Sequence, residues 1–197
     1  MAAVPFVGLT GGMGAGKSEA LSALERLGAA TLSSDAVVHE LLVTDEVRDL
    51  LVERFGAEVA PGGELDRAAV ASVVFADPDQ RSWLERMLWP RVGARIAAWR
   101  EELDARAEPP PAAVVEVPLL FEAGMETVFD HTIAIVAGDA VRAERTAARG
   151  HAATGERDAR QLAQEEKAER ADFAVRNDGS LEELEEALSR ILETIGT

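Results

Sequence analysis

A glycine-rich segment near the start of the chain, GGMGAGKS at residues 11–18, constrains the fold more than any other feature. Gly11, Gly16, Lys17 and Ser18 match the spacing G-x-x-x-x-G-K-[ST]. An apolar run at residues 4–9 precedes the motif and predicts a short buried strand, and apolar residues at helical spacing follow it. In this strand–loop–helix context the spacing indicates a phosphate-binding loop. The alternative is a glycine-rich turn that carries a surface lysine.

The residue types in this segment suit the binding of phosphate. A loop that wraps around a phosphate group must aim several backbone N–H groups inward, which requires tight or positive dihedral angles and leaves no room for Cβ atoms. The helix that begins near Lys17 adds the positive end of its dipole. Lys17 brings a charge to the β- and γ-phosphates of a nucleotide, and Ser18 offers a hydroxyl to Mg²⁺. The residues expected to bind ATP here are Gly11, Gly12, Met13, Gly14, Ala15, Gly16, Lys17, Ser18 and Glu19.

The order of the predicted elements indicates an α/β fold. Residues 35–107 have mostly helical periodicity, with a kink or a break expected at Pro90, and the prolines at 109–111 end this region. Residues 150–170 are polar and predict a solvated helix or a mobile loop. Strands that alternate with helices in this way predict a parallel five-stranded sheet with helices on both faces. The predicted strands lie at residues 4–9, 29–32, 112–120, 131–137 and 172–175.

The last predicted helix has a clear start and end. Ser180 and Glu183 have the spacing of a capping box, and Gly196 lies just past the end of the apolar periodicity. The apolar stripe expected to face the core consists of Leu181, Leu184, Leu188, Ile191 and Ile195.

Composition excludes several classes of function. The 197 residues carry a formal net charge of −16, whereas nucleic acids and anionic membranes are bound by basic surfaces. The chain has no cysteine, so it has no disulfide, no thiol nucleophile and no cysteine metal cluster. The first residues do not resemble a signal peptide, and no apolar run approaches the ~20 residues of a membrane span. We expect a cytoplasmic protein without a nucleic-acid or membrane partner.

A phosphate-binding loop does not identify the phosphate acceptor, although a chain of this length with a helical insertion is typical of a small-molecule kinase. Asp35 follows the second predicted strand, where a carboxylate can orient an acceptor hydroxyl or take its proton. Asp35 could equally cap the next helix, with Ser33 and Ser34 as rival caps. Glu116 is a charge within an apolar strand. It could face the Mg²⁺ water shell or the acceptor, or simply lie at the strand end.

Three arginines recur at helical spacing just before the polar segment: Arg142, Arg145 and Arg149. On one helix face they could reach the transferring phosphoryl group as a lid closes. The alternative is a solvated arginine stripe, which is common in a chain with 18 arginines and only two lysines, Lys17 and Lys167.

Taken together, several stretches resemble the dephospho-CoA kinase family, over nearly the whole length of the chain. The phosphate loop is shared by many kinases, whereas the ELDR and VPLLFE stretches are more particular to this family. The matching stretches are GLTGGMGAGKS from Gly8, SSDAVVHEL from Ser33, GELDRAAVASVVFAD from Gly63, WLERMLWPRV from Trp83, VVEVPLLFEAGME from Val114 and RQLAQEEKAERADFAVRNDGSLEEL from Arg160.

This resemblance implies a P-loop kinase fold and a reaction. ATP, with Mg²⁺, phosphorylates the ribose 3′-hydroxyl of dephospho-CoA to give coenzyme A and ADP, the last step of coenzyme A biosynthesis. The enzyme is expected to be a monomer or a weak homo-oligomer. The alternatives are a nucleotide-binding regulatory paralogue without transfer activity, and a kinase for another small alcohol or nucleotide. The implied parts are a core at 1–34, 109–149 and 171–197, a helical acceptor-binding insertion at 35–108 and a lid at 150–170.

The resemblance also implies roles for single residues. The catalytic residues are Asp35, Lys17 and Arg145. Ser18 is the Mg²⁺ ligand, and Gln161 and Lys167 match a family stretch of unassigned role. The implied additions to the ATP site are Arg149, Asn177 and Gly179. The implied acceptor-binding residues are Asp35, Trp89, Glu116, Pro118 and Leu119.

The sequence departs from the family pattern at three places. Trp89 stands where a histidine is usual, Gly150 stands where an aspartate is usual, and the segment before Gln161 is shorter than usual. An indole at position 89 could stack on the adenine of the acceptor or cover its pantetheine chain. Trp89 could equally be a core residue of the insertion, like Trp83 and Trp99.

Overall fold

The computed structural model describes residues 3–148 and 161–196. The chain divides into two compact units. Unit 1 consists of residues 1–33 and 100–197, and unit 2 of residues 34–99.

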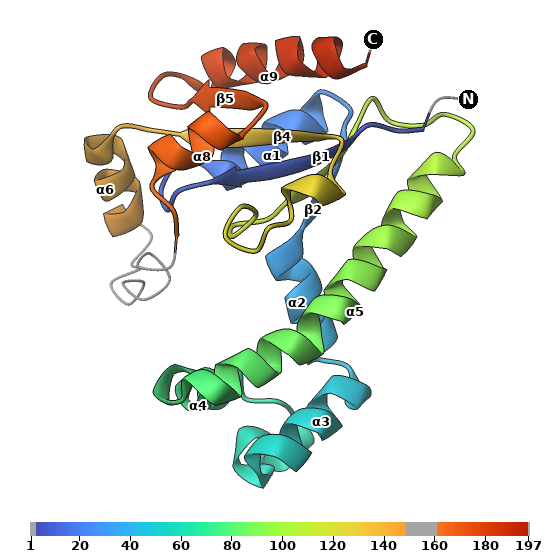
Figure 1. Ribbon diagram of the computed structural model, residues 1–197, viewed down its shortest axis with the longest axis vertical. Helices are drawn as coiled ribbons and strands as arrows, with labels where there is room; N and C mark the ends of the chain where they lie inside the picture. Colours follow the sequence, from blue (N-terminus) through green and yellow to red (C-terminus); the bar gives the residue numbers. More distant parts are fainter. Residues whose placement is uncertain (1–2, 149–160, 197) are drawn as a thin grey trace. The chain divides into compact units, whose positions relative to one another are not determined.

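Unit 1 is built on a five-stranded sheet in the order β2-β3-β1-β4-β5 (Figure 1). Every neighbouring pair of strands is parallel. The sequence prediction of a parallel five-stranded sheet is therefore confirmed, and the predicted strands overlap the observed ones. The strands are β1 (Phe6–Gly11), β2 (Ala30–Ser33), β3 (Ala113–Glu116), β4 (His131–Val136) and β5 (Phe173–Arg176).

Helices cover both faces of this sheet (Figure 1). The alternation of side chains along β1 separates the two faces. Val7 and Leu9 join the main core with α1 and α9, whereas a Cβ on Gly8 would meet Leu120 and Phe129. Helix α8 packs against β1, β4 and β5. The helices of unit 1 are α1 (Lys17–Arg26), α6 (Asp139–Ala148), α8 (Gln164–Arg170) and α9 (Leu181–Ile195), with a short 3₁₀ helix at Glu126–Val128.

The capping box predicted for the last helix is confirmed. Ser180 accepts a hydrogen bond from the N–H of Glu183, and the Glu183 carboxylate accepts one from the N–H of Ser180. Gly196 is the C-cap residue. Most of the apolar stripe faces the core, but the prediction for Leu181 is wrong. Leu181 is 54% exposed because it begins the helix, beyond the edge of the buried face.

Unit 2 is helical, as predicted, and has a core of its own that includes Leu51, Val70 and Leu88. Of the kink or break expected at Pro90, the break is wrong, because α5 runs through this residue. A proline removes one backbone hydrogen bond and crowds the preceding turn. Next to Pro90, the guanidinium of Arg91 donates a hydrogen bond to the carbonyl of Met87 at 2.8 Å. The helices are α2 (Ser34–Leu42), α3 (Asp45–Phe55), α4 (Arg67–Ala76) and α5 (Pro78–Asp104), with 3₁₀ helices at Ala57–Val59 and Pro61–Gly63.

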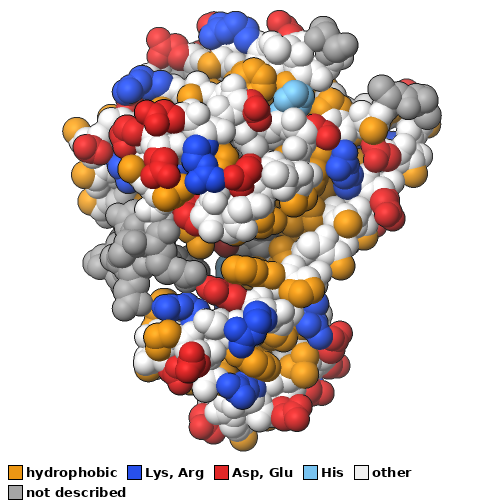
Figure 2. Space-filling view, in the orientation of Figure 1, with side chains coloured by type: hydrophobic (Ala, Val, Ile, Leu, Met, Phe, Trp, Pro, Cys, Tyr) orange, Lys and Arg blue, Asp and Glu red, His pale blue; other side chains and the backbone are white. Residues whose placement is uncertain are grey.

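Charged side chains of both signs are interspersed on the face of the molecule drawn in Figure 2. Within the described part of the chain, no helix is long and apolar enough to cross a membrane.

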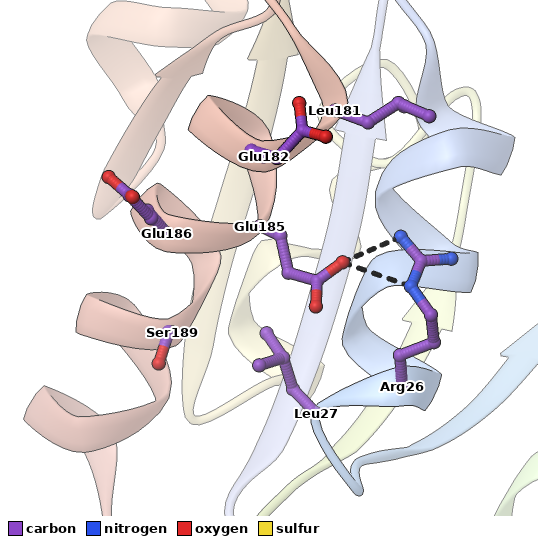
Figure 3. Close-up of a pocket in the computed structure, with 7 residues that line it drawn as sticks. All are labelled: Arg26, Leu27, Leu181, Glu182, Glu185, Glu186 and Ser189. Carbon is purple, nitrogen blue, oxygen red and sulfur yellow. Dashed lines mark hydrogen bonds and ion pairs between the residues drawn. The ribbon is translucent and has the colours of Figure 1, made fainter.

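A surface hollow lies between α1 and α9 (Figure 3). Arg26 reaches across it and binds one carboxylate oxygen of Glu185 through two nitrogens, at 2.9 and 2.8 Å. The hollow lies at the C-terminal end of α1, whereas the glycine-rich loop precedes its N-terminal end. Ten helical residues span ~15 Å, so the hollow is separate from the phosphate loop.

Gly8→Ala should destabilise the protein, because the new Cβ would lie 2.5 Å from Cδ1 of Leu120 and 2.8 Å from Cδ2 of Phe129. Overpacking of this kind costs about 1–3 kcal/mol, measurable as a loss of the free energy of unfolding in urea. Gly93→Ala is the matched control. A Cβ there meets nothing within 4 Å, and alanine favours the helix, so the stability should be unchanged or higher. Equal effects of the two substitutions would contradict the tight approach at Gly8.

Candidate active site

The glycine-rich loop lies at the C-terminal edge of the sheet, between β1 and α1. From the ends of the adjacent strands β1 and β3 the chain continues in opposite directions, to β2 on one side and to β4 on the other. Open parallel sheets bind ligands at such a switch point, outside the carboxyl ends of the strands. The sheet topology and the loop motif therefore indicate the same position for a nucleotide.

Two glycines of the loop are required by its shape. Gly14 and Gly16 have φ angles of 74° and 94°, which side chains with a Cβ rarely adopt. Neighbouring atoms also exclude a Cβ at both positions. A Cβ on Gly14 would lie 2.6 Å from the carbonyl oxygen of Arg142, and one on Gly16 would lie 2.1 Å from Nδ2 of Asn177.

Side chains from outside the loop hold two of its carbonyl groups. Nε of Arg142 donates to the carbonyl of Met13 at 2.9 Å. Nδ2 of Asn177 donates to the carbonyl of Ala15, also at 2.9 Å, and Arg145 makes a longer contact of 3.5 Å to the same oxygen. In a trans peptide the C=O and the next N–H point in opposite directions. The N–H groups of residues 14 and 16 are therefore turned away from these side chains, as anion binding by a loop requires.

Lys17 and Ser18 lie in the first turn of α1. The Lys17 ammonium donates to the carbonyls of Gly11 and Gly12 at 3.1 and 3.2 Å, so it lies over the loop that it follows. Ser18 is exposed. Among the described residues no group of three or more acidic, histidine or cysteine side chains is placed to hold a metal ion. Mg²⁺ at kinase sites is held largely by substrate phosphates and waters with few protein ligands, so a lone hydroxyl fits this ion.

Arg145 and Asn177 form the base of the loop. Asn177 is 2% exposed, and its carbonyl accepts a hydrogen bond from Nη1 of Arg145 at 3.0 Å. Nη2 of Arg145 lies 4.0 Å from Oε2 of Glu19, an oxygen without a hydrogen-bond partner. Gly179 is two residues farther along the chain, immediately before the cap of α9. The predicted catalytic residue Arg145 and the predicted ATP-site residues Asn177 and Glu19 thus lie together around the loop.

The predicted row of three arginines is described only in part. Arg142 and Arg145 lie on α6 and both contact the loop, so the interpretation of these two as a solvated stripe is wrong. Arg149 lies outside the described residues, as does Gly150.

The predicted acceptor-side residues of unit 1 follow one another at the end of β3. Glu116 is the last residue of this strand, half-buried, and pairs in register with Leu9 and Ser33. A position at the strand end explains how a charge fits into an apolar segment. Pro118 and Leu119 lie in the turn that follows.

The predicted acceptor-side residues of unit 2 are Asp35 and Trp89. Asp35 lies inside the first turn of α2, two residues past the end of β2, so the helix-capping position precedes it. Trp89 is 55% exposed, and the core of unit 2 includes Trp83 but not Trp89. The alternative of Trp89 as a core residue is therefore wrong.

The expectation that the polar segment is solvated is wrong for Gln164 and Lys167, although most other residues of α8 are exposed. Gln164 and Lys167 are buried, because α8 packs against the sheet. The Gln164 amide exchanges two hydrogen bonds with the backbone of Ala137, at 3.1 and 2.8 Å. Helix α8 packs against β1 and β4, which are distant in sequence, so periodicity within the segment did not predict the burial of Gln164 and Lys167. The feature of the sequence that could have drawn attention to this position is the lysine itself, because Lys167 is one of only two lysines in an arginine-rich chain.

The start of α6 is held by Asp178, which sequence reasoning did not single out. Its carboxylate accepts a hydrogen bond from the N–H of Gly138 at 2.5 Å and contacts Arg176 at 2.8 Å. The Gly138 N–H, and after it the Arg176 guanidinium, hold the pKa of Asp178 below its ordinary value. Asp178 thereby ties the segment beside Asn177 to the helix that carries the loop-binding arginines.

Comparison with known proteins identifies the family. A family model described as dephospho-CoA kinase matches residues 5–183. A dephospho-CoA kinase from Deinococcus radiodurans is 40% identical over 192 residues, which cover 96% of this chain and 91% of the relative. One from Symbiobacterium thermophilum is 39% identical over 182 residues, which cover 90% of this chain and 75% of the relative. The chain belongs to the dephospho-CoA kinase family, as its motifs predicted.

Solved structures agree with this assignment. The crystal structure of TT1252 from Thermus thermophilus matches with a TM-score of 0.79 and 34% identity, over 98% of both chains. Shikimate kinase from Aquifex aeolicus matches with a TM-score of 0.50 and 17% identity, over 96% of both chains, which shows the fold alone. The predicted P-loop kinase fold is confirmed.

Asp178→Asn should lower the stability at neutral pH and have less effect in acid. A carboxyl whose pKa is lowered by folding stabilises the protein above its unfolded pKa, and this stability is lost as the pH falls through the folded value. The difference in melting temperature between wild type and variant should therefore be largest near pH 7 and shrink below about pH 4. Arg176→Met, which removes the second cause, should reproduce part of the effect. A difference that is constant with pH would contradict this role of Asp178.

Proposed function

We propose that the residues around the phosphate loop, together with Asp35, phosphorylate the ribose 3′-hydroxyl of dephospho-CoA from ATP to give coenzyme A and ADP. The activity follows from membership of the family; the assignment of roles to residues is our proposal. The observation that carries it is the loop itself. Its carbonyls at Met13 and Ala15 are held on one side, so that the N–H groups of residues 14 and 16 are turned to the other side, where phosphates would bind.

The loop and Lys17 stabilise the charge of the transferring group. Phosphoryl transfer needs little covalent chemistry from the protein, and positioning and electrostatics supply most of the rate. We assign the β- and γ-phosphates to the N–H groups of residues 11–18 and to the Lys17 ammonium. Arg145 is assigned to the same charge, with Glu19 and Asn177 orienting its guanidinium. Preorganised donors of this kind act without reorganising during the reaction.

Mg²⁺ is the expected cofactor, with Ser18 as its protein ligand. The exposed hydroxyl of Ser18 in the first turn of α1 suits an ion whose other ligands are phosphate oxygens and waters. When bound with ATP, Mg²⁺ neutralises charge that develops on the phosphate oxygens.

Asp35 is assigned to the acceptor hydroxyl, which it orients and whose proton it accepts. Its place directly after β2, at the carboxyl edge of a parallel sheet, supports this role. Glu116, Pro118 and Leu119 are assigned to the acceptor because they follow β3 at the same edge. The exposed indole of Trp89 is assigned to the adenine or pantetheine part of the acceptor.

A product assay tests the proposal directly. The protein is incubated with Mg-ATP and, separately, with dephospho-CoA, AMP, shikimate or pantothenate. We expect 3′-phosphorylation of dephospho-CoA alone. Phosphorylation of only another acceptor would identify a different kinase, and nucleotide binding without any product would identify a regulatory paralogue.

Lys17→Ala should abolish nearly all turnover while the protein stays folded. The side chain carries charge at the transferring group, and removal of one preorganised electrostatic contact costs about 3 kcal/mol of barrier or more. The measurements are kcat with Mg-ATP and dephospho-CoA and a thermal melt. Near-normal kcat together with a normal melt would show that this loop does not bind the transferred phosphate.

Asp35→Asn should bind Mg-ATP almost normally and fail in transfer. The amide retains the size and one acceptor oxygen of the carboxylate, but it cannot take the proton. A positioned acid–base group contributes roughly 10²- to 10⁴-fold in rate. Equilibrium binding of ATP and single-turnover rates separate the two effects. A variant that loses stability but keeps its kcat would assign Asp35 to the structure of α2 instead.

A further inference from the structure

The ammonium of Lys167 is a buried charge that the proposed reaction does not use. The side chain is 0% exposed. Burial of a charge is costly unless the charge is paired and hydrogen-bonded. Lys167 meets both conditions, since Nζ donates to the carbonyl of Pro118 at 2.7 Å and lies 2.9 Å from Oε1 of Glu122.

Both partners of Lys167 belong to the turn that follows β3, residues 117–124, which we call the β3 turn. This turn carries Pro118 and Leu119, two of the proposed acceptor-binding residues. Lys167 therefore binds the turn at two points, one backbone carbonyl and one side chain. Glu122 is itself nearly enclosed, with 13% of its side chain exposed, and its Oε2 has no hydrogen-bond partner.

Further hydrogen bonds extend this arrangement to the phosphate loop and to the start of α8. The carbonyl of Pro118 also accepts from the hydroxyl of Thr10 at 3.3 Å, one residue before the loop. Oε1 of Glu122 also accepts from the N–H of Leu162 at 2.8 Å. The β3 turn is thus fixed to β1 and to the chain that leads into α8.

We propose that Lys167 and Glu122 are a positioning pair that holds the β3 turn in the conformation that binds the acceptor. The inference rests on the proposed function, because the acceptor side of the site is part of it. Lys167 is too deeply buried to touch a substrate and acts through Pro118 and its neighbours. Loss of the pair should therefore weaken the use of dephospho-CoA and leave the ATP side nearly unchanged.

The choice of lysine supports this role. Arginine is the common basic residue of this chain, yet lysine occupies this position. An ammonium is a compact charge with three rotatable donors, whereas a guanidinium is a wide planar fork. The compact group fits between a single carbonyl oxygen and a single carboxylate oxygen in an enclosed space.

Kinetics and stability together distinguish positioning from mere structural support. Lys167→Met leaves the Glu122 charge buried without its partner and should lower the melting temperature. Lys167→Met/Glu122→Gln removes both charges and should recover much of that temperature. The carbonyl of Pro118 still lacks its ammonium donor in the double variant. The KM of the double variant for dephospho-CoA should therefore stay raised about tenfold or more. Its KM for ATP should stay within about twofold of the wild-type value.

Arg170→Met is the matched control on the same helix. Arg170 also joins α8 to other segments, through an ion pair with Glu126 and by lying over the ring of Phe121 in the β3 turn at 4.8 Å. It is partly exposed, and its hydrogen bond goes to Glu126 and not to the Pro118 carbonyl. This variant should raise KM for dephospho-CoA far less than the double variant does, because it leaves the hydrogen bond to the Pro118 carbonyl in place. Recovery of KM together with stability in the double variant, or an equal rise in KM from Arg170→Met, would overturn the proposal.

Amide hydrogen exchange tests the pair without any assay of activity. In the double variant, exchange should accelerate at residues 117–124 and not at residues 11–18. Unchanged exchange in the β3 turn would overturn the proposal even if the enzyme is active. A wild-type protein that forms no coenzyme A would instead contradict the proposed function, and the exchange result would still decide whether the pair holds the turn.

Discussion

The phosphate loop keeps its shape because side chains from outside it bind the carbonyl groups that point away from the nucleotide side. Arg142 binds the carbonyl of Met13, and Asn177 binds that of Ala15. A loop rich in glycine has many accessible conformations, and ordering it costs conformational entropy. These external hydrogen bonds select the conformation in which neighbouring N–H groups face the opposite side. The site therefore depends on α6 and on the segment after β5 as much as on the motif.

The parallel sheet explains why residues distant in sequence meet at this edge. The carboxyl ends of β1 and β3 are adjacent, so the loop after β1 and the turn after β3 begin side by side. The carbonyl of Pro118 accepts from Thr10 and from Lys167, which joins the nucleotide side to the proposed acceptor side through a single oxygen atom. These two hydrogen bonds fix the turn after β3 relative to the phosphate loop, and in the proposed function neither of them involves a substrate.

Local signals predicted much of this molecule. The strand–loop–helix motif, the five strands and the capping box at Ser180 depend on residues close in sequence, and the structure confirms them. The burial of Lys167 depends on β3 and its turn, more than 40 residues away, and a polar periodicity says nothing of such contacts. At Pro90 the general rule that proline interrupts a helix did not hold, because α5 continues through this residue. The roles of Asp35 and Trp89 stay predictions, since they concern substrates.

Because the net charge of the protein is −16, the binding of anionic substrates has to depend on donors that lie close to them. ATP and dephospho-CoA are both anions, so the overall field of the protein opposes their approach. At physiological ionic strength, charges farther away than about 8 Å are largely screened, and nearby donors decide the binding. The donors proposed for phosphate are local in this sense, because Lys17 and Arg145 both contact the loop and α1 begins directly after it. Nη2 of Arg145 lies 4.0 Å from Oε2 of Glu19, a contact that helps to orient the guanidinium. We therefore expect attraction for phosphate to be concentrated at the loop.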